Sequence, residues 1–180
     1  MSLKHPAERE GMIHVYTGDG KGKTTAALGL ALRAAGHDMK VCFIQFMKGW
    51  AYGEVASARH LPDFTLLQFG RADFVNPDEP SPQDKELAQR ALNKAREVMA
   101  SGSYDLLVLD EVNVAVGYGL ITLASLLEIL DQKPPSLELV LTGRGAGPEI
   151  IKRADLVTEM KEIKHYYSTR SLPARKGIEY

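Results

Sequence analysis

Residues 12–25 read MIHVYTGDGKGKTT, a short strand pattern followed by a loop with three glycines and the first residues of a helical pattern. The strand is predicted over 12–16 and the helix from about Lys23 to Ala35. Glycines permit backbone dihedrals closed to other residues and let backbone N–H groups come close to phosphate oxygens. The N-terminus of the following helix adds partial positive charge. This stretch therefore predicts a P-loop, a phosphate-binding turn between a strand and a helix.

The loop carries side chains suited to a nucleotide triphosphate. Lys23 would contact the phosphates, the Thr24 hydroxyl would ligate Mg²⁺, and Lys21 lies near as a second cation. The loop is a variant, because Thr17 stands where the first glycine of the usual spacing is found. The alternative is a glycine-rich turn with surface lysines. The predicted ATP-binding residues of the loop are Thr17, Gly18, Asp19, Gly20, Lys21, Gly22, Lys23, Thr24 and Thr25.

Two further segments end predicted strands with polar residues. Asp110 and Glu111 follow the apolar run 106–109, where carboxylates near the phosphates can hold Mg²⁺ directly or through water. The alternative is an acidic helix cap. Arg144 lies at the carboxyl end of another predicted strand, where ligands of open α/β sheets bind, although a surface arginine in a turn is the alternative.

Short β-rich runs alternate with helical patterns along the whole chain, which predicts an α/β fold with parallel strands. Ser81 is expected to cap a helix that begins at Pro82 and ends near residue 101. We expect a flexible segment over 1–11 and a single domain over 12–180. The other predicted elements are strands at 41–46, 65–69, 106–109, 137–142 and 156–160, a helix at 120–130 and a short helix from residue 148.

The overall composition excludes several classes of protein. The 180 residues include 22 Lys and Arg against 23 Asp and Glu, so no broad attraction to nucleic acid or an anionic membrane is expected. One cysteine, Cys42, excludes an internal disulfide framework and favours the cytoplasm, and its apolar neighbours predict core packing. No run approaches the roughly 20 apolar residues that span a bilayer, so no membrane association is expected.

A P-loop leaves the reaction open. A small-molecule kinase would carry several arginines in a lid, whereas the acidic loop 70–82 contains only Arg71. The chain has no Asn-Lys-x-Asp string for guanine recognition. Helicases and recombinases need cationic DNA-binding loops, which the composition does not provide.

Five motifs in collinear order carry a family resemblance: TGDGKGKTTAALG at 17–29, FIQF at 43–46, LDE at 109–111, TGRG at 142–145 and KGIEY at 176–180. Together they closely resemble the CobA/BtuR-type ATP:corrinoid adenosyltransferases over residues 12–180. The resemblance implies a RecA-like P-loop fold, with a mostly parallel sheet and helices on both faces. It also implies a homodimer and a partner that supplies electrons, such as a flavoprotein reductase.

The implied reaction transfers the 5′-deoxyadenosyl group of ATP to a Co(I) corrinoid and releases triphosphate, in coenzyme B12 biosynthesis or salvage. Because Co(I) is a strong nucleophile, no acid, base or nucleophile is expected from the protein, and Lys21 and Lys23 would stabilise the leaving group. By position, Thr24 and Glu111 would hold Mg²⁺ with Asp110 in support, while Arg144 would join the ATP site. The alternatives are an ATPase or small-molecule kinase that cleaves at the γ-phosphate, and a binding module without catalysis.

The corrinoid-binding residues implied by the resemblance are Phe74 and Asn76. Relatives carry an aromatic pair there that displaces the lower axial ligand of cobalt, and Asn76 stands in place of a tryptophan. Trp50 and Tyr52 are candidates for lining the corrinoid or the adenine, with a core or dimer contact as the alternative. His165 could meet a phosphate or a corrinoid side chain, against a plain surface position.

Overall fold

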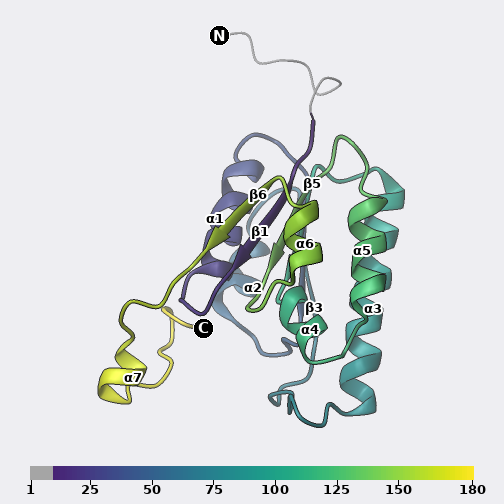
Figure 1. Cartoon of the computed structure of the whole chain (residues 1–180). Helices are drawn as coiled ribbons and strands as arrows, with labels where there is room; N and C mark the ends of the chain where they lie inside the picture. Colours follow the sequence, from purple (N-terminus) through teal and green to yellow (C-terminus); the bar gives the residue numbers. More distant parts are fainter. Residues whose placement is uncertain (1–9) are drawn as a thin grey trace.

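The computed structural model of the chain describes residues 10–180, in which six parallel strands form one sheet (Figure 1). The strand order is β3-β2-β4-β5-β1-β6. Their bounds are β1 Ile13–Thr17, β2 Val41–Phe46, β3 Phe64–Phe69, β4 Leu106–Asp110, β5 Glu138–Thr142 and β6 Leu156–Glu159. Every pairing in the sheet is parallel, so the carboxyl ends of all the strands meet at one edge.

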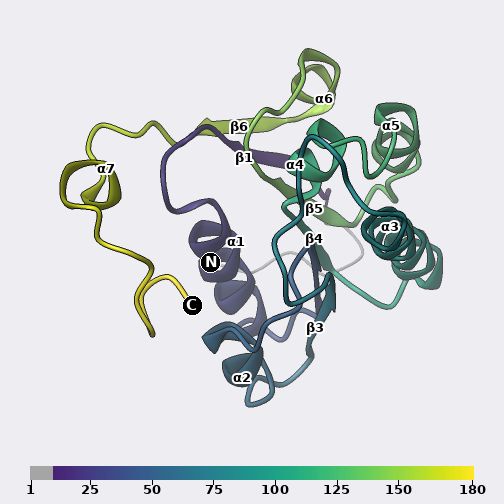
Figure 2. The same cartoon turned by 90° about the horizontal axis from the view of Figure 1, so that it is seen from below.

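Helices cover both faces of the sheet, as the view in Figure 2 shows. Helix α1 packs on one face, and α3, α4, α5 and α6 lie on the other. The bounds are α1 Lys23–Ala35, α2 Gly53–Ala58, α3 Pro82–Ser101, α4 Val112–Gly117, α5 Leu123–Asp131, α6 Pro148–Arg153 and α7 Tyr166–Arg170. The predicted α/β P-loop fold with helices on both faces is thus confirmed.

Alternate residues of the central strands feed two hydrophobic clusters. Leu107 and Leu109 of β4 face the cluster under α3 and α5, whereas Leu106 and Val108 face the cluster under α1. Because side chains of a strand point alternately to opposite faces, a strand covered on both sides is apolar throughout. This explains why β2 is buried at every position, as its sequence predicts.

The sheet order brings the strand that leads into the P-loop close to the strand that ends at Asp110. One strand, β5, lies between β1, which leads into the P-loop, and β4, which ends at Asp110. Register pairs Tyr16 of β1 with Thr142 of β5, and Gln45 of β2 with Asp110 of β4. The loops after these strands therefore open onto the same edge of the sheet.

The predicted elements are mostly present, with three omissions. Helix α1 and strand β2 have the predicted bounds, and Ser81 caps α3. Helices α2, α4 and α7 were missed, because five or six residues do not show a helical period. The helix predicted over 120–130 begins later, at Leu123, because the Thr122 side chain caps it by accepting from the Ser125 N–H.

The start of the chain is described only from residue 10. Of the predicted flexible segment 1–11, residues 1–9 lie outside the described part. Gly11 is buried, and its N–H donates to the Pro135 carbonyl at 2.7 Å. Among residues 10–180, no helix has the length and apolar character needed to cross a membrane.

Candidate active site

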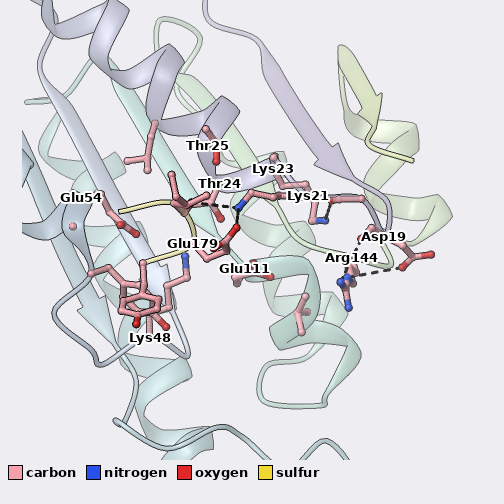
Figure 3. A pocket seen from close by; sticks show the side chains of 18 of the residues that line it. Asp19, Lys21, Lys23, Thr24, Thr25, Lys48, Glu54, Glu111, Arg144 and Glu179 are labelled. Carbon is pink, nitrogen blue, oxygen red and sulfur yellow. Dashed lines mark hydrogen bonds and ion pairs between the residues drawn. The ribbon is translucent and has the colours of Figure 1, made fainter. Parts of the chain in front are cut away.

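A pocket of about 890 Å³ opens at the carboxyl edge of the sheet, beside the P-loop (Figure 3). We call it the P-loop pocket. Its wall is formed by residues 19–25, the start of α2, the start of α4, the loop after β5 and the last residues of the sequence. Lys21, Lys23, Glu111 and Arg144 all line it, so the structure brings together the P-loop cations and both later motifs.

The P-loop lysine is held by the loop itself. Lys23 Nζ donates to the carbonyl oxygens of Gly18 at 2.6 Å and Gly20 at 2.7 Å. Burial lowers the pKa of Lys23, an effect that Glu111 opposes. The ammonium is therefore held at the turn by two neutral carbonyl oxygens.

The close approach of a neighbouring segment requires glycine in the loop. A Cβ on Gly18 would lie 2.5 Å from the Met160 carbonyl oxygen, and one on Gly20 would lie 2.7 Å from it. The Gly20 N–H already donates to this oxygen at 2.7 Å. Gly22 has φ +117°, a conformation that L residues rarely adopt. Thr17 also has an internal role, since its hydroxyl oxygen accepts from the Ala146 N–H at 3.2 Å.

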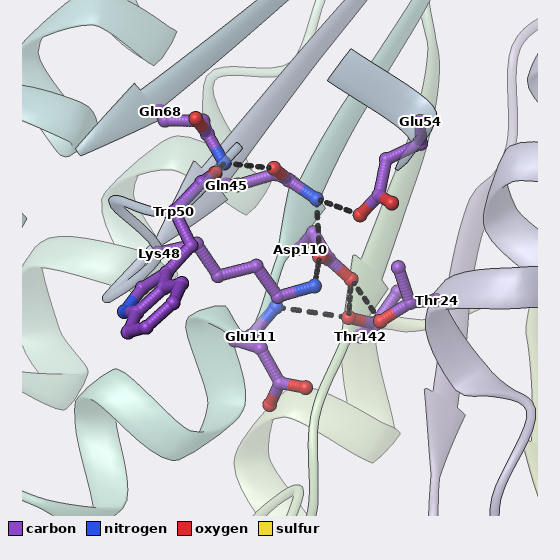
Figure 4. Close-up of polar contacts among 9 residues, drawn as sticks. All are labelled: Thr24, Gln45, Lys48, Trp50, Glu54, Gln68, Asp110, Glu111 and Thr142. Atoms are coloured by element: carbon purple, nitrogen blue, oxygen red, sulfur yellow. Dashed lines mark hydrogen bonds and ion pairs between the residues drawn. The ribbon is translucent and has the colours of Figure 1, made fainter. Parts of the chain in front are cut away.

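A fully buried carboxylate, Asp110, organises the floor of the pocket (Figure 4). Its Oδ1 accepts from the hydroxyls of Thr24 at 2.8 Å and Thr142 at 2.7 Å. Its Oδ2 accepts from Lys48 Nζ at 2.8 Å and Gln45 Nε2 at 3.4 Å. A carboxylate offers about four lone-pair positions, so these four donors saturate Asp110. It therefore acts here by orienting Thr24.

Thr24 and Glu111 place a hydroxyl and a carboxylate at the wall of the pocket. Because the Thr24 hydroxyl proton points to Asp110, its oxygen lone pairs remain available. Glu111 adopts a left-handed φ of +64°, and its N–H donates to the Thr142 hydroxyl at 2.9 Å. Such a conformation costs about 1–2 kcal/mol for a residue with a side chain.

The electrostatics of Glu111 suit a cation. Burial and then Asp110 raise the pKa of Glu111, against the opposing charges of Lys48, Lys23 and Arg144. Among residues 10–180 no group of three or more His, Cys, Asp or Glu forms a metal cluster. One carboxylate and one hydroxyl fit Mg²⁺, which keeps waters and takes further oxygens from a substrate's phosphates.

Arg144 reaches across to the P-loop. Its Nη2 donates to the Asp19 carbonyl oxygen at 3.3 Å, and its Nε lies 4.0 Å from Asp19 Oδ1. Arg144 therefore offsets the negative charge of Asp19 in the P-loop. Both side chains are exposed, so the pair remains adjustable.

Lys48 is a functional residue that sequence reasoning missed. It follows β2, and the opposing charge and hydrogen bond of Asp110 raise its pKa despite burial, which lowers it. Its ammonium also lies 5.4 Å from the centre of the Tyr52 ring. The sequence offered one sign of this role: Lys48 stands two residues after the buried strand β2. In the sheet, β2 is the neighbour of β4, which ends in Asp110.

The aromatic candidates divide between the pocket and its surroundings. Phe74 and Tyr52 line the pocket, and Phe74 is 96% exposed. The Trp50 indole instead donates to the Ala72 carbonyl of the Phe74 loop. Asn76 is not among the lining residues, and its side-chain oxygen accepts from the Asp78 N–H at 3.2 Å.

His165 has both a structural and a pocket position. Its Nδ1 accepts from the Tyr167 N–H at 3.1 Å and so caps α7, while the residue also lines the pocket. From the sequence, a plain surface position is the simpler interpretation of His165. The sequence does not indicate that the start of α7 lies at the P-loop pocket.

Comparison with known proteins assigns the family. Residues 9–180 match the family described as ATP:corrinoid adenosyltransferase BtuR/CobO/CobP. The chain is 36% identical to a corrinoid adenosyltransferase of Pseudomonas aeruginosa, with 96% of this chain and 85% of that protein covered. It is 34% identical to the corrinoid adenosyltransferase of Escherichia coli and to corrinoid adenosyltransferase CobA of Salmonella typhimurium, each with 96% of this chain and 87% of the relative covered. The chain therefore belongs to the ATP:corrinoid adenosyltransferase family.

Proposed function

We propose that the protein transfers the 5′-deoxyadenosyl group of ATP to a Co(I) corrinoid and releases triphosphate, in adenosylcobalamin biosynthesis or salvage. One observation carries the proposal: the P-loop cations and the exposed ring of Phe74 line the same pocket of about 890 Å³. A triphosphate and a large substrate with an apolar face can therefore meet there.

The proposed step is a nucleophilic substitution at the 5′ carbon of ATP. Co(I) contributes its electron pair to a new cobalt–carbon bond, and the bond between C5′ and the α-phosphate oxygen breaks. Triphosphate leaves with that electron pair. Because the attacking centre is already nucleophilic, the protein aligns the reactants and stabilises the leaving charge.

The pocket residues have distinct parts in this step. Lys23 exchanges the Gly18 and Gly20 carbonyls for phosphate oxygens, and Lys21 and Arg144 add positive charge. Thr24, oriented by Asp110, and Glu111 would hold Mg²⁺. When bound, Mg²⁺ neutralises charge on the triphosphate. Backbone N–H groups of the loop complete the ATP site.

We assign the corrinoid to the side of the pocket where Phe74 lies. Apolar bulk from the loop that contains Phe74 and Asn76 would displace the lower axial ligand of cobalt. Loss of this donor makes reduction to Co(I) easier. On this proposal Phe74→Ala raises the KM for corrinoid at least fivefold, a loss of about 1 kcal/mol or more, while the Kd for Mg-ATP stays unchanged.

Further parts of the proposal concern assembly and setting. We propose one domain over 12–180, a homodimer, a cytoplasmic location and a flavoprotein reductase as the electron source. Light scattering coupled to gel filtration tests the dimer, for which a mass of twice 19.8 kDa is expected. A measured mass of 19.8 kDa, that of a single chain, would contradict the dimer.

The reaction is tested by incubating the protein with Mg-ATP and a chemically reduced corrinoid. The cobalt–carbon absorption change and the phosphate product are followed together. We expect alkylcorrinoid and triphosphate in equal amounts. ADP and orthophosphate without alkylcorrinoid would instead establish a kinase or ATPase, and absence of turnover with retained ATP binding would favour a binding module.

The proposed role of the P-loop in binding the triphosphate is tested separately with Lys23→Ala. We expect turnover to fall by about 100-fold or more, because the ammonium stabilises the charge that develops on the leaving triphosphate. Lys85→Ala, an exposed lysine on α3, serves as the matched control and should retain full turnover. Unchanged turnover of Lys23→Ala would mean that the P-loop is not the triphosphate-binding site.

A further inference from the structure

We call residues 175–180 the tail segment, of which residues 177–180 line the P-loop pocket. In Figure 2 this end of the chain lies to the left of α1 and α2. At one side, Lys21 Nζ donates to the Ile178 carbonyl at 3.4 Å and lies 3.5 Å from Glu179 Oε1. At the other side, the Tyr180 carbonyl carbon lies 4.0 Å from where a Cβ on Gly53 would be. The tail segment thus spans from the P-loop to the start of α2.

Glu179 holds the tail segment in this shape. Its Oε2 accepts from the Arg175 N–H at 2.7 Å, and Arg175 Nη2 donates to Oε1 at 3.3 Å. The Tyr166 hydroxyl of α7 donates to the same carboxylate, and the Arg175 guanidinium lies 4.8 Å from the centre of the Tyr166 ring. Hydrogen bonds from Tyr166 and then Arg175 lower the pKa of Glu179 to about 2, although partial burial opposes them. Glu179 therefore stays an anion at neutral pH.

Lys21 connects the Glu179 carboxylate to the P-loop, of which it is a part. Its side chain is 43% exposed, against 16% for Glu179, and both of its contacts with the tail segment are long. The ammonium carries three donors, so Lys21 can contact a triphosphate oxygen while it keeps its contact with Glu179. Glu179 is itself held by Tyr166 and Arg175, so its position does not depend on Lys21.

We infer that the tail segment is a component of the ATP site, in which Glu179 is a positioning residue that holds Lys21 at the pocket wall. The inference rests on the proposed function only in that the pocket binds a triphosphate. Glu179 is not among the ATP-binding residues expected from the sequence. The physical basis is preorganisation, because a lysine held at the pocket wall loses less conformational freedom when the phosphates arrive.

The test measures Mg-ATP binding by calorimetry without corrinoid, on the full chain. We expect Glu179→Ala to raise the Kd about threefold to tenfold, within the range of an exposed ion pair with its hydrogen bonds. Glu179→Gln should lie between wild type and Glu179→Ala, because its amide keeps part of the hydrogen bonding. Glu162→Ala, which removes an exposed carboxylate before α7, is the matched control and should bind as wild type.

A double-mutant cycle distinguishes positioning from a merely structural role. In a Lys21→Ala background, Glu179→Ala should produce no further loss of affinity, because its effect passes through Lys21. Additive losses would overturn the inference, and so would tighter binding by Glu179→Ala, the signature of a tail that competes with ATP. Deletion of 177–180 provides a second variant, expected to weaken binding at least as much as Glu179→Ala.

Lys23→Ala separates this inference from the proposed function. If Lys23→Ala loses ATP binding while Glu179→Ala binds as wild type, the inference alone is wrong. If Lys23→Ala binds ATP as wild type does, the pocket is not the triphosphate site, and both the proposed function and this inference are wrong.

Discussion

Asp110 shows how one residue combines stability with the arrangement of a site. It is fully buried, and its charge is balanced by Lys48 at 2.8 Å. Two charges in a low-dielectric interior contribute little net stability as a pair, yet removing one partner leaves the other uncompensated. The same carboxylate accepts from Thr24, so the pair also sets the hydroxyl that faces the pocket.

We therefore expect Asp110→Asn to lower the free energy of unfolding by about 3 kcal/mol, since the Lys48 ammonium is left without its counter-charge. Urea unfolding followed by circular dichroism measures this. Combining Asp110→Asn with Lys48→Met should recover a large part of the loss. A double variant as unstable as the sum of the two single variants would show that the two residues do not stabilise each other.

At the scale of elements, helix α3 begins with a capping box whose acid also pairs with a loop. The Ser81 hydroxyl accepts from the Asp84 N–H at 3.2 Å, and Asp84 Oδ2 accepts from the Ser81 N–H at 3.1 Å. Asp84 Oδ1 also accepts from Arg71 Nε at 2.9 Å. The helix start thus anchors the loop that carries Phe74.

This anchor predicts a pH dependence of stability. Burial raises the pKa of Asp84, but hydrogen bonds from Ser81 and Arg71 outweigh burial and hold it below the ordinary value of 3.8. The anion's contribution is therefore complete well above pH 3.8 and is lost as the pH falls through the lower pKa of the folded state. Asp84→Asn should cost about 1.5–3 kcal/mol at pH 7, as for hydrogen bonds to a charged group.

Urea unfolding of wild type and Asp84→Asn between pH 7 and pH 2 measures the difference. The stability gap between the two should narrow below about pH 4. Asp78→Asn, an exposed position in the preceding loop, should show a gap near zero at every pH. A gap for Asp84→Asn that stays constant down to pH 2 would contradict the anchor.

At the scale of the whole molecule, the sheet interior encloses Cys42, the single cysteine. Cys42 lies on β2, fully buried, and burial raises the pKa of its thiol to about 12. The prediction that it packs in the core is confirmed. Because the thiolate is the reactive form, a buried thiol with this pKa reacts only when the sheet opens.

We expect a thiol reagent to modify Cys42 at a rate proportional to the population of the unfolded state. Leu109→Ala, at a fully buried position of β4, should destabilise the fold by about 2–5 kcal/mol and so raise the labelling rate about 30-fold or more. Leu32→Ala, at an exposed position of α1, is the matched control and should label as wild type. Rapid labelling of the wild type would contradict the enclosed core.

Features that depend on neighbours in sequence were predictable from the chain alone. The P-loop, the bounds of α1 and β2 and the cap at Ser81 follow from period, glycine placement and capping, which act over a few residues. The position of Glu111 and Arg144 in the P-loop pocket and the contact of Asp110 with Thr24 were also predictable, because parallel strands bring their carboxyl ends to one edge.

The tertiary structure alone decided which side chains meet at that edge. Lys48 and Asp110 are 62 positions apart, and Lys21 and Ile178 are 157 apart. Such contacts depend on the strand order and on the path of a short helix, α7, that has no periodic signal of its own. Local sequence therefore determined the glycine-rich turn between β1 and α1, whereas packing between distant segments determined which groups contact Thr24 and Lys21.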